Sequence, residues 1–485
     1  MMNPVIARRL SQLGILAVFL GGTVYLLNVL AEQGVYGLAT SLVVMLPLLW
    51  IMFAGTRWWV VMPIGVAFGG AFSLSFKFYT HEIALLLSLM ALLPVLAIRA
   101  QKMIDRVKVT TALWVLLGLF LVNIARSLIA SRWEGLGGGG SIVRVYLHGM
   151  WPVIFLAAFY HYGSTRPLKW VLILLYGTYL GRSLAGVSSY YFGYQVQVPF
   201  LNFVIGTGGA WDLRFTGIQL AMLAFACSQF IQSRWGKILH VCGIGLSLWL
   251  VLLGGGRASL GMLCVIPVAW AAIRRRFGWF SAASAGLFLL VMVLNQRPDI
   301  IYLFPEQAQR TLSILVAESS TSWLDSHTAV KLSNEWHQRL SSLGFERWSE
   351  SVLTMVIGNR IEPYDAAYEA YSVTMEDKAQ VAARQGIYES GLWTMLSPMG
   401  LCGVVLYSML FYFLLKGPFL VLMKEGICGI PHVFYFWAVI ELVLWIVFCW
   451  ISGGSPSHEL MMAGIAKAAY EDSRKTGKEG TPCAS

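Results

Sequence analysis

Charged residues are scarce in this chain: Asp, Glu, Lys and Arg make up 12% of its 485 residues, whereas 57% are hydrophobic. Soluble globular domains use roughly twice that share of charge, so the composition excludes an ordinary soluble protein. Apolar runs of about 17 to 25 residues recur along most of the chain, each long enough to cross a bilayer as a helix. The sequence therefore predicts a polytopic membrane protein built from helices, which satisfy their own backbone hydrogen bonds in lipid.

Motifs for metal and disulfide chemistry are also missing. The chain has no HExxH and no convincing DxD-like acidic pair, and its eight histidines lack metal-ligand spacing. Its seven cysteines show no CxxC spacing, and most of them fall inside apolar runs. We therefore expect a metal-independent protein without a cofactor, whose cysteines are small core residues.

Acidic residues are fewer than basic ones, 24 against 35, for a net charge of +11. This excess could indicate nucleic acid, but in a membrane protein Lys and Arg retained on the cytoplasmic side explain it, so no nucleic-acid partner is expected. The run after Arg8 and Arg9 is long enough to stay as a first span, so we expect no cleavable signal peptide.

The apolar runs predict an all-α fold with about 12–14 transmembrane helices. Basic residues of the short loops all fall on one side if every run spans, which makes the N-terminus cytoplasmic. The candidate spans are roughly 12–31, 36–54, 58–75, 82–98, 110–126, 146–162, 169–187, 214–231, 238–254, 258–273, 278–295, 392–415, 433–452 and a shorter 458–471.

One large polar insertion interrupts the spans at residues 297–390, on the side opposite the basic loops. Its apolar residues recur at helical spacing, which predicts short amphipathic helices lying against the membrane. We therefore divide the chain into an N-terminal bundle of about 11 helices (1–296), the external loop (297–390), the C-terminal helices (391–472) and a cytoplasmic tail (473–485).

Arginines gather at the predicted external ends of the spans, where basic residues should be few. A guanidinium keeps its charge when desolvated and offers a planar fork of donors that fits phosphate or carboxylate, so the set indicates an anion-binding site. Alternatively, each arginine snorkels to a lipid headgroup or caps a helix. The set comprises Arg126, Arg132, Arg144, Arg182, Arg214 and Arg257.

Two of these arginines lie in distinctive settings. Arg214 starts an apolar run with Gly217 three positions later, and Arg257 stands in the turn GGGRA between two apolar runs. At these positions the chain resembles the O-antigen ligase and O-antigen polymerase superfamily, whose members often show an Arg-x-x-Gly helix start and a Gly-rich Arg-Gly/Ala turn. The stretch ERWSESVLTMVIGNRI, residues 346–361, resembles the family's Arg and Trp helix followed by a glycine turn.

The return from the insertion into the membrane carries a further resemblance. Family members read His-Asn-x-x-Leu-x-x-Leu-x-x-x-Gly-x-x-Gly there, and this chain reads ESGLWTMLSPMGLCG over residues 389–403. Leu396, Gly400 and Gly403 fit, whereas Glu389 stands in the place of the His. In all, the resemblance covers about residues 200–455.

The departure at Glu389 bears on mechanism, because the family's His is the residue usually proposed to assist the acceptor hydroxyl. A carboxylate near apolar surface can accept that proton instead, which makes Glu389 the candidate catalytic residue. It could also cap the following helix or pair with Arg384. The alternative bases are Glu350, Glu362, Asp365 and Glu369, with His337 as a stand-in for the missing His.

The resemblance implies a GT-C-like glycosyltransferase of the bacterial inner membrane. It would polymerise polyprenyl-diphosphate-linked repeat units into O-antigen, capsule or exopolysaccharide at the periplasmic face. The partners implied are this lipid-linked donor, a glycan acceptor, membrane lipids and a chain-length regulator or flippase. Arg214 and Arg257, with Arg126, Arg182 and Arg347, would hold the diphosphate. The alternatives are a ligase that transfers the glycan to a lipid A-core acceptor, a transporter or flippase of lipid-linked glycans, and a structural subunit of a secretion assembly.

Overall fold

The computed structural model describes two compact units of the chain. Unit 1 comprises the described residues within Met1–Thr111 and Trp151–Gly209. Unit 2 comprises the described residues within Ala112–Met150 and Ala210–Ser485. The described residues are 61–68, 71–73, 77–79, 107–130, 146–147, 149–157, 159, 165, 168–193, 196–198, 203–205, 209–231, 233–275, 277–316, 325–362, 374–449 and 456–475.

Unit 1 contains two helices and a small antiparallel sheet. Its elements are α2 (Val61–Phe68), β1 (Ala71–Ser73), β2 (Lys77–Tyr79), α6 (Leu168–Phe192), β3 (Val196–Val198) and β4 (Phe203–Ile205). The strand order is β2-β1-β4-β3, with Phe72 paired to Phe78 on one side and to Phe203 on the other. Apart from this small sheet, the described elements are helices, which is consistent with the predicted all-α membrane protein. The strands of the sheet have three residues each, too few for the alternation that reveals a strand in sequence.

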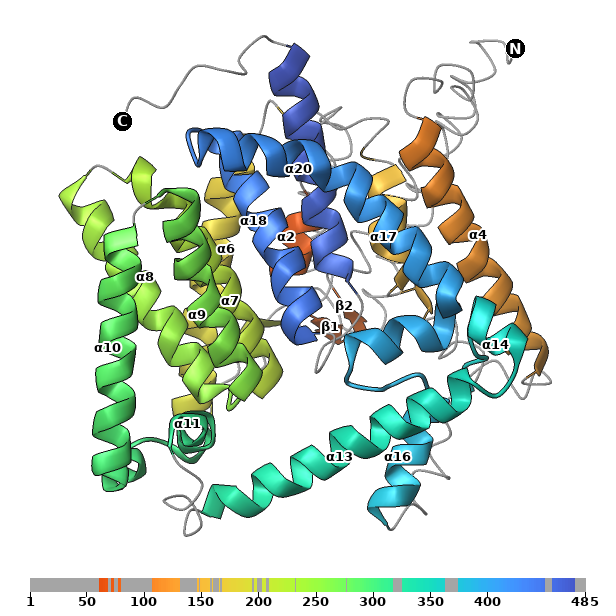
Figure 1. The fold of residues 1–485 in the computed structure, drawn as a ribbon, viewed down its shortest axis with the longest axis horizontal. Helices are drawn as coiled ribbons and strands as arrows, with labels where there is room; N and C mark the ends of the chain where they lie inside the picture. Colours follow the sequence, from red (N-terminus) through yellow and green to blue (C-terminus); the bar gives the residue numbers. More distant parts are fainter. Residues whose placement is uncertain are drawn as a thin grey trace, which may run out of the picture. The chain divides into compact units, whose positions relative to one another are not determined.

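Unit 2 is helical throughout its described residues (Figure 1). Its elements are most of α4 (Val107–Ala130), then α7 (Ala210–Cys227), η3 (Ser228–Phe230), α8 (Arg234–Leu253), α9 (Arg257–Ile273), α10 (Phe277–Gln296), η4 (Pro298–Leu303), α11 (Glu306–Leu312), η5 (Ser313–Leu315), α13 (Asp325–Trp348), α14 (Val352–Ile357), α16 (Met375–Arg384), α17 (Gly391–Glu425), α18 (Ile430–Leu444), η6 (Trp445–Cys449) and α20 (Ser457–Lys475).

The predicted membrane character is confirmed in the part of the chain that the structure describes. Five helices there are long and apolar enough to cross a membrane: Val109–Ile129, Leu168–Phe192, Arg234–Leu253, Gly391–Glu425 and Ile430–Phe448. The predicted span 58–75 was too long, because α2 ends at Phe68 and a strand follows. Runs 12–31, 36–54 and 82–98 lie outside the described residues and 146–162 lies partly outside them, so the total number of spans and their orientation stay predictions.

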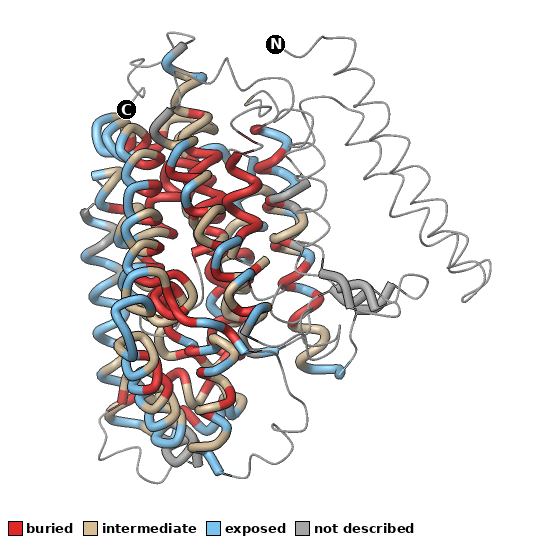
Figure 2. Tube along the Cα trace, turned by 90° about the vertical axis from the view of Figure 1, so that its right-hand side faces the viewer, coloured by how far each residue is buried: buried red, intermediate tan, exposed pale blue. Residues whose placement is uncertain are grey.

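The core of unit 2 lies where α7, α18 and α20 pack together. Every residue from Leu220 to Ala224 is fully buried, and so are long stretches of α18 and α20 (red in Figure 2). A helix that is apolar on all sides is expected to be buried. Small side chains such as Ala221 and Ala463 let helices approach closely, which matters in lipid because close van der Waals packing drives helix association there.

The predicted short helices of the insertion are also found, among them α11, α14 and α16, and one long helix accompanies them. α13 has 24 residues and buries Leu340 and Leu343 against Ala379 of α16 and Tyr388. These two leucines lie three positions apart and, with Trp336, form an apolar stripe on one face of the helix. α13 runs across the ends of several membrane helices, with α16 and α14 near its C-terminal end (Figure 1).

The cysteines follow the prediction only in part. Cys227, Cys242, Cys264 and Cys402 are free thiols in apolar helices, but only Cys227 is buried; Cys264 and Cys402 are partly buried, and Cys242 is exposed, so the prediction of a core position was wrong for Cys242. Cys428, in contrast, is disulfide-bonded. It lies in the short connection between α17 and α18, outside an apolar run, so the argument from apolar surroundings did not apply to it.

Candidate functional site

The turn between α8 and α9 places Arg257 at the first residue of a helix. α8 ends at Leu253, Gly255 has a φ of +67°, and Gly256 is the N-cap residue of α9. Glycine adopts a left-handed φ at no steric cost, which explains a glycine at position 255. The first backbone N–H groups of α9 have no intrahelical acceptor and lie at the positive end of the helix dipole. Together with Arg257 they suit an anion.

Arg214, from the first turns of α7, reaches this same turn. A Cβ atom at position 256 would collide with Arg214 Cδ and lie 2.9 Å from Arg214 Nη1. Glycine at position 256 therefore leaves the space that the Arg214 side chain occupies. The structure thus brings together the arginines of the two sequence motifs, although they are far apart in the chain.

A third arginine, Arg310 of α11, lies beside these two. Gln307 Oε1 lies 2.6 Å from the position of a Cβ on Gly255, and Arg310 follows one turn later on the same face of α11. Arg310 is close enough to act electrostatically on both Arg214 and Arg257. Sequence reasoning missed this residue because α11 is a short polar helix without a motif.

α13 holds the arginine turn and the candidate base on one face. Arg257 Nη2 donates a hydrogen bond to Asn334 Oδ1 at 2.6 Å, and His337 Nδ1 lies 3.5 Å from Glu389 Oε2. Asn334 and His337 are three residues apart, so they project from the same side of α13 about 4.5 Å apart along its axis. α13 therefore brings Arg257 and Glu389 into one neighbourhood. No signal in the sequence linked Asn334 to Arg257.

Glu389 itself has an unusual backbone. Its φ is +51°, in the left-handed region that a non-glycine residue adopts at a cost of about 1–3 kcal/mol, and such strain gathers at functional sites. Its side chain is 47% exposed, and its charge acts on Arg214. Arg384, the alternative partner expected from sequence, has its Nη1 3.7 Å from Glu362 Oε2. The contact with His337 joins the two candidate bases.

Two other predicted arginines of unit 2 bind the turn that follows α14. Arg126 Nη1 donates to Gly358 O at 3.2 Å and to Asn123 Oδ1 at 2.9 Å. Arg347 Nη2 lies 3.6 Å from Glu362 Oε1. Arg347 follows Asn334 by about 20 Å along α13, so it does not join Arg257 at the glycine turn. Their role in diphosphate binding stays a prediction.

Arg182 belongs to unit 1. It lies on α6, is 8% exposed, and its Nη1 donates to Ala67 O at 2.8 Å. Ala67 lies in the last turn of α2, where carbonyl groups lack intrahelical donors, so this arginine caps a helix. This contact matches the capping alternative given for the set, and its diphosphate-binding role also stays a prediction.

Glu441 of α18 is a carboxylate buried among the apolar helices of unit 2. It is 3% exposed, and its Oε1 accepts a hydrogen bond from Gln219 Nε2 and contacts His458 Nδ1, each at 2.5 Å. Trp437 Nε1 donates to Gln219 Oε1 at 2.8 Å, which completes a polar cluster linking α7, α18 and α20. Among the described contacts of Glu441, His458 supplies the basic group.

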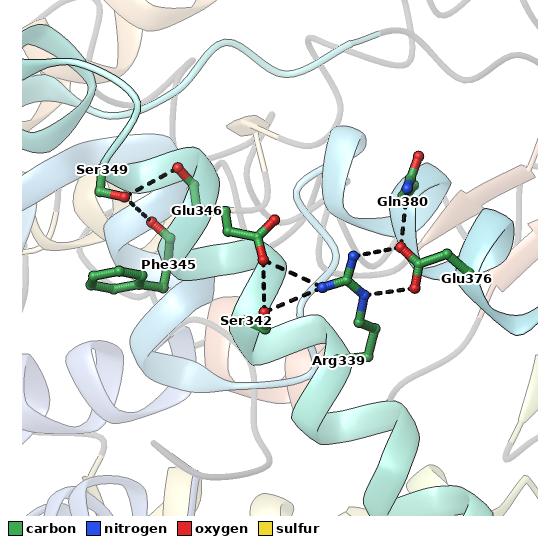
Figure 3. Close-up of polar contacts among 7 residues, drawn as sticks. All are labelled: Arg339, Ser342, Phe345, Glu346, Ser349, Glu376 and Gln380. Atoms are coloured by element: carbon green, nitrogen blue, oxygen red, sulfur yellow. Dashed lines mark hydrogen bonds and ion pairs between the residues drawn. The ribbon is translucent and has the colours of Figure 1, made fainter.

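A network of charged residues braces α13 against α16. Arg339 Nε donates to Glu376 Oε2 at 2.6 Å, and Arg339 Nη1 contacts Ser342 Oγ at 3.2 Å and Glu346 Oε1 at 3.3 Å (Figure 3). Hydrogen bonds from Arg339, with one from Gln380, hold the pKa of Glu376 at about 2. The brace orients the helix that carries Asn334 and His337.

The contact between Arg339 and Glu376 predicts that the stability of the folded protein depends on pH. Because the pKa of Glu376 is lowered in the folded state, its stabilising contribution is full above its ordinary pKa of 4.5 and is lost as the pH falls toward about 2. The difference in apparent unfolding temperature between wild type and Glu376→Gln should be constant from neutral pH to about 5 and vanish toward pH 2. This difference in unfolding temperature should be small, because the side chains of Arg339 and Glu376 are partly exposed. A difference that grows on acidification would contradict this assignment.

The assembled site combines three guanidinium groups with a carboxylate and an imidazole. Arg214, Arg257 and Arg310 surround the glycine turn, and the carboxylate of Glu389 is close enough to act electrostatically on Arg214. Such a cluster has a surplus of positive charge, which an anion with more than one charge would neutralise. The Glu389–His337 pair can accept a proton next to it. No family profile matches the sequence of this chain, and no curated protein matches it as a relative.

Proposed function

We propose that this protein is a membrane glycosyltransferase that polymerises polyprenyl-diphosphate-linked oligosaccharide repeat units. The observation that carries the proposal is the meeting of Arg214, Arg257 and Arg310 at one glycine turn, next to Glu389 and His337. The resemblance of this turn and of the α7 start to the polymerase and ligase superfamily supports the same function. The donor, the acceptor and the periplasmic location come from that resemblance.

The arginine cluster can stabilise the negative charge of the leaving lipid diphosphate. When an acceptor hydroxyl attacks the anomeric carbon, the bond from that carbon to the diphosphate oxygen breaks and negative charge builds on the leaving lipid diphosphate. Guanidinium groups already in place stabilise this charge without reorganisation, and they bind phosphate through two parallel hydrogen bonds. The free N–H groups at the start of α9 add to this stabilisation.

The Glu389–His337 pair receives the proton that the acceptor hydroxyl loses. Glu389 lies 3.5 Å from His337 and is half exposed, so an acceptor can reach it. The imidazole orients the carboxylate and can share the proton after attack. The left-handed backbone of Glu389 is strain of the kind that gathers at functional sites, which supports this role.

Glu389→Gln tests this proposal. General bases typically contribute about 10²–10⁴ in rate, so we expect polymer output to fall by at least the lower value in a deletion strain that carries this variant at matched protein level. Lipid-linked repeat units should accumulate on the external face. The matched control is Glu335→Gln, which removes an exposed carboxylate two residues from His337 and should leave polymer output unchanged.

The outcomes separate the candidate functions. Normal polymer with Glu389→Gln would return this residue to a structural role. Polymer of normal length that fails to reach a lipid A-core acceptor would identify a ligase. Repeat units accumulating on the cytoplasmic face would identify a flippase, which needs a cationic cavity but no base.

A further inference from the structure

The end of α14 and the turn after it pack against two apolar helices. Asn123 Nδ2 of α4 donates to Ile357 O at 2.7 Å and to Pro398 O of α17 at 2.8 Å. Arg126 of α4 donates to the next carbonyl along the turn, that of Gly358, at 3.2 Å. These contacts fix the position of the C-terminal end of α14 along the axis of α4.

This contact point lies within the apolar part of α4. The apolar span runs from Val109 to Ile129, and its 21 residues match the roughly 30 Å thickness of the hydrocarbon layer. Asn123 precedes the end of this span by six residues, which places it about 9 Å inside. The C-terminal end of α14 is therefore at membrane depth, although it belongs to the polar insertion.

The backbone of this turn meets the requirement for such a position. Non-helical backbone is tolerated at membrane depth only where protein groups satisfy its hydrogen bonds. Asn359 N donates to Ser397 O at 2.5 Å, Ile361 N donates to Ser127 Oγ at 3.1 Å, and Tyr146 Oη donates to Asn359 O at 3.4 Å. Together with the two carbonyls bound by α4, these contacts satisfy most backbone groups of the turn, whereas the buried side-chain Nδ2 of Asn359 has no partner among the described residues.

The other side of α14 presents apolar side chains outward. Val352 is 77% exposed and Leu353 56%, and Val356 is exposed as well. Phe345, near the C-terminal end of α13, is also exposed. Trp348 lies at the base of this face, where its Nε1 donates to Met355 O at 3.2 Å. In water such a patch would be unfavourable. At the edge of the hydrocarbon layer it is favourable, and tryptophan is enriched there.

We infer that residues 352–361 form a re-entrant segment that dips into the apolar layer of the membrane, with Val352, Leu353 and Val356 in contact with lipid acyl chains. Lipid is the occupant of this face because the segment is bound at the depth of the apolar span of α4. The inference does not depend on the proposed reaction. Its consequence is that the C-terminal end of α13 is anchored in the membrane, while its middle crosses the arginine site.

Fluorescence quenching in vesicles tests this inference. Leu353→Cys in the full-length protein, labelled with an environment-sensitive fluorophore and reconstituted in phosphatidylcholine vesicles, is exposed to nitroxide-labelled lipid and, separately, to aqueous iodide. Lys378→Cys, an exposed position on α16, is the matched control, and labelled wild type gives the background from native cysteines. Val352→Cys repeats the measurement at a neighbouring position.

The expected result is severalfold stronger quenching by nitroxide lipid at Leu353 than at Lys378, with the reverse order for iodide. Efficient iodide quenching at Leu353 would overturn the inference, because the face would then be in water. Protection from both quenchers would also overturn it, since the face would then be covered by protein.

Discussion

Arg257→Ala and Arg214→Ala should each lower glycan transfer by about 10²–10³, the loss typical when one preorganised donor to a developing charge is removed. Both side chains lie at the same glycine turn and within reach of Arg310, so each variant removes one of three adjacent guanidinium groups. Arg257→Lys should recover little activity, because an ammonium lacks the planar fork that binds phosphate through two hydrogen bonds. Transfer is measured as polymer formed per amount of inserted protein.

The control for this series is Arg297→Ala. Arg297 also lies in the polar insertion, but it is 69% exposed and pairs with Asp299 at 2.8 Å, so its loss should leave transfer unchanged. Full activity in Arg214→Ala, Arg257→Ala and Arg257→Lys would remove the diphosphate-binding hypothesis. Arg310→Ala extends the test to a residue that only the structure brought into the site, and we expect a loss similar to that of Arg214→Ala.

Gly400→Ala should be the most destabilising of the simple substitutions. Gly400 breaks the helical geometry of α17 with a φ of +59°, and a Cβ there would lie 2.5 Å from Val356 C and 2.6 Å from Gly358 N. Backbone strain of about 1–3 kcal/mol adds to a similar cost for overpacking against backbone atoms that cannot rotate away. The expected loss is roughly 2–6 kcal/mol, seen as a lower apparent unfolding temperature in detergent.

Gly358→Ala should have a similar effect for the same reason. Gly358 has a φ of +92°, and its Cβ would lie 2.5 Å from Met399 N and 2.6 Å from Pro398 O. The two glycines thus let α14 and the kink of α17 interlock through backbone atoms. Gly245→Ala is the matched control: nothing lies within 4 Å of a Cβ at that position of α8, and alanine favours a helix over glycine by about 0.5–1 kcal/mol. Equal unfolding temperatures for Gly400→Ala and Gly245→Ala would contradict the interlock.

Sequence motifs predicted part of the site but did not predict the partner of each arginine. The motifs around Arg214 and Arg257 singled out two arginines that the structure does bring together. The same kind of argument also selected Arg126, Arg182 and Arg347, which bind backbone carbonyls or a glutamate of their own surroundings. Charge and position at a helix end do not specify which partner an arginine side chain meets, because that partner comes from another part of the chain.

Residues without a local pattern were missed altogether. Arg310 sits on a short polar helix, and Asn334 is one of several polar residues on α13, so neither stood out. The segment VLTMVI of α14 has six residues, far too few for a spanning helix, and only hydrogen bonds from α4 and to α17 reveal that its C-terminal end packs against these two helices.

By itself, the sequence determined that this protein is a membrane protein made mainly of helices, with a helical insertion between its apolar runs. Hydropathy and helical period are local properties that add along a segment, so they can be recognised without knowing its neighbours. The tertiary structure alone decided that α7, the α8–α9 turn, α11, α13 and the start of α17 contribute to one site. Only packing brings such distant segments together, and no local pattern records it.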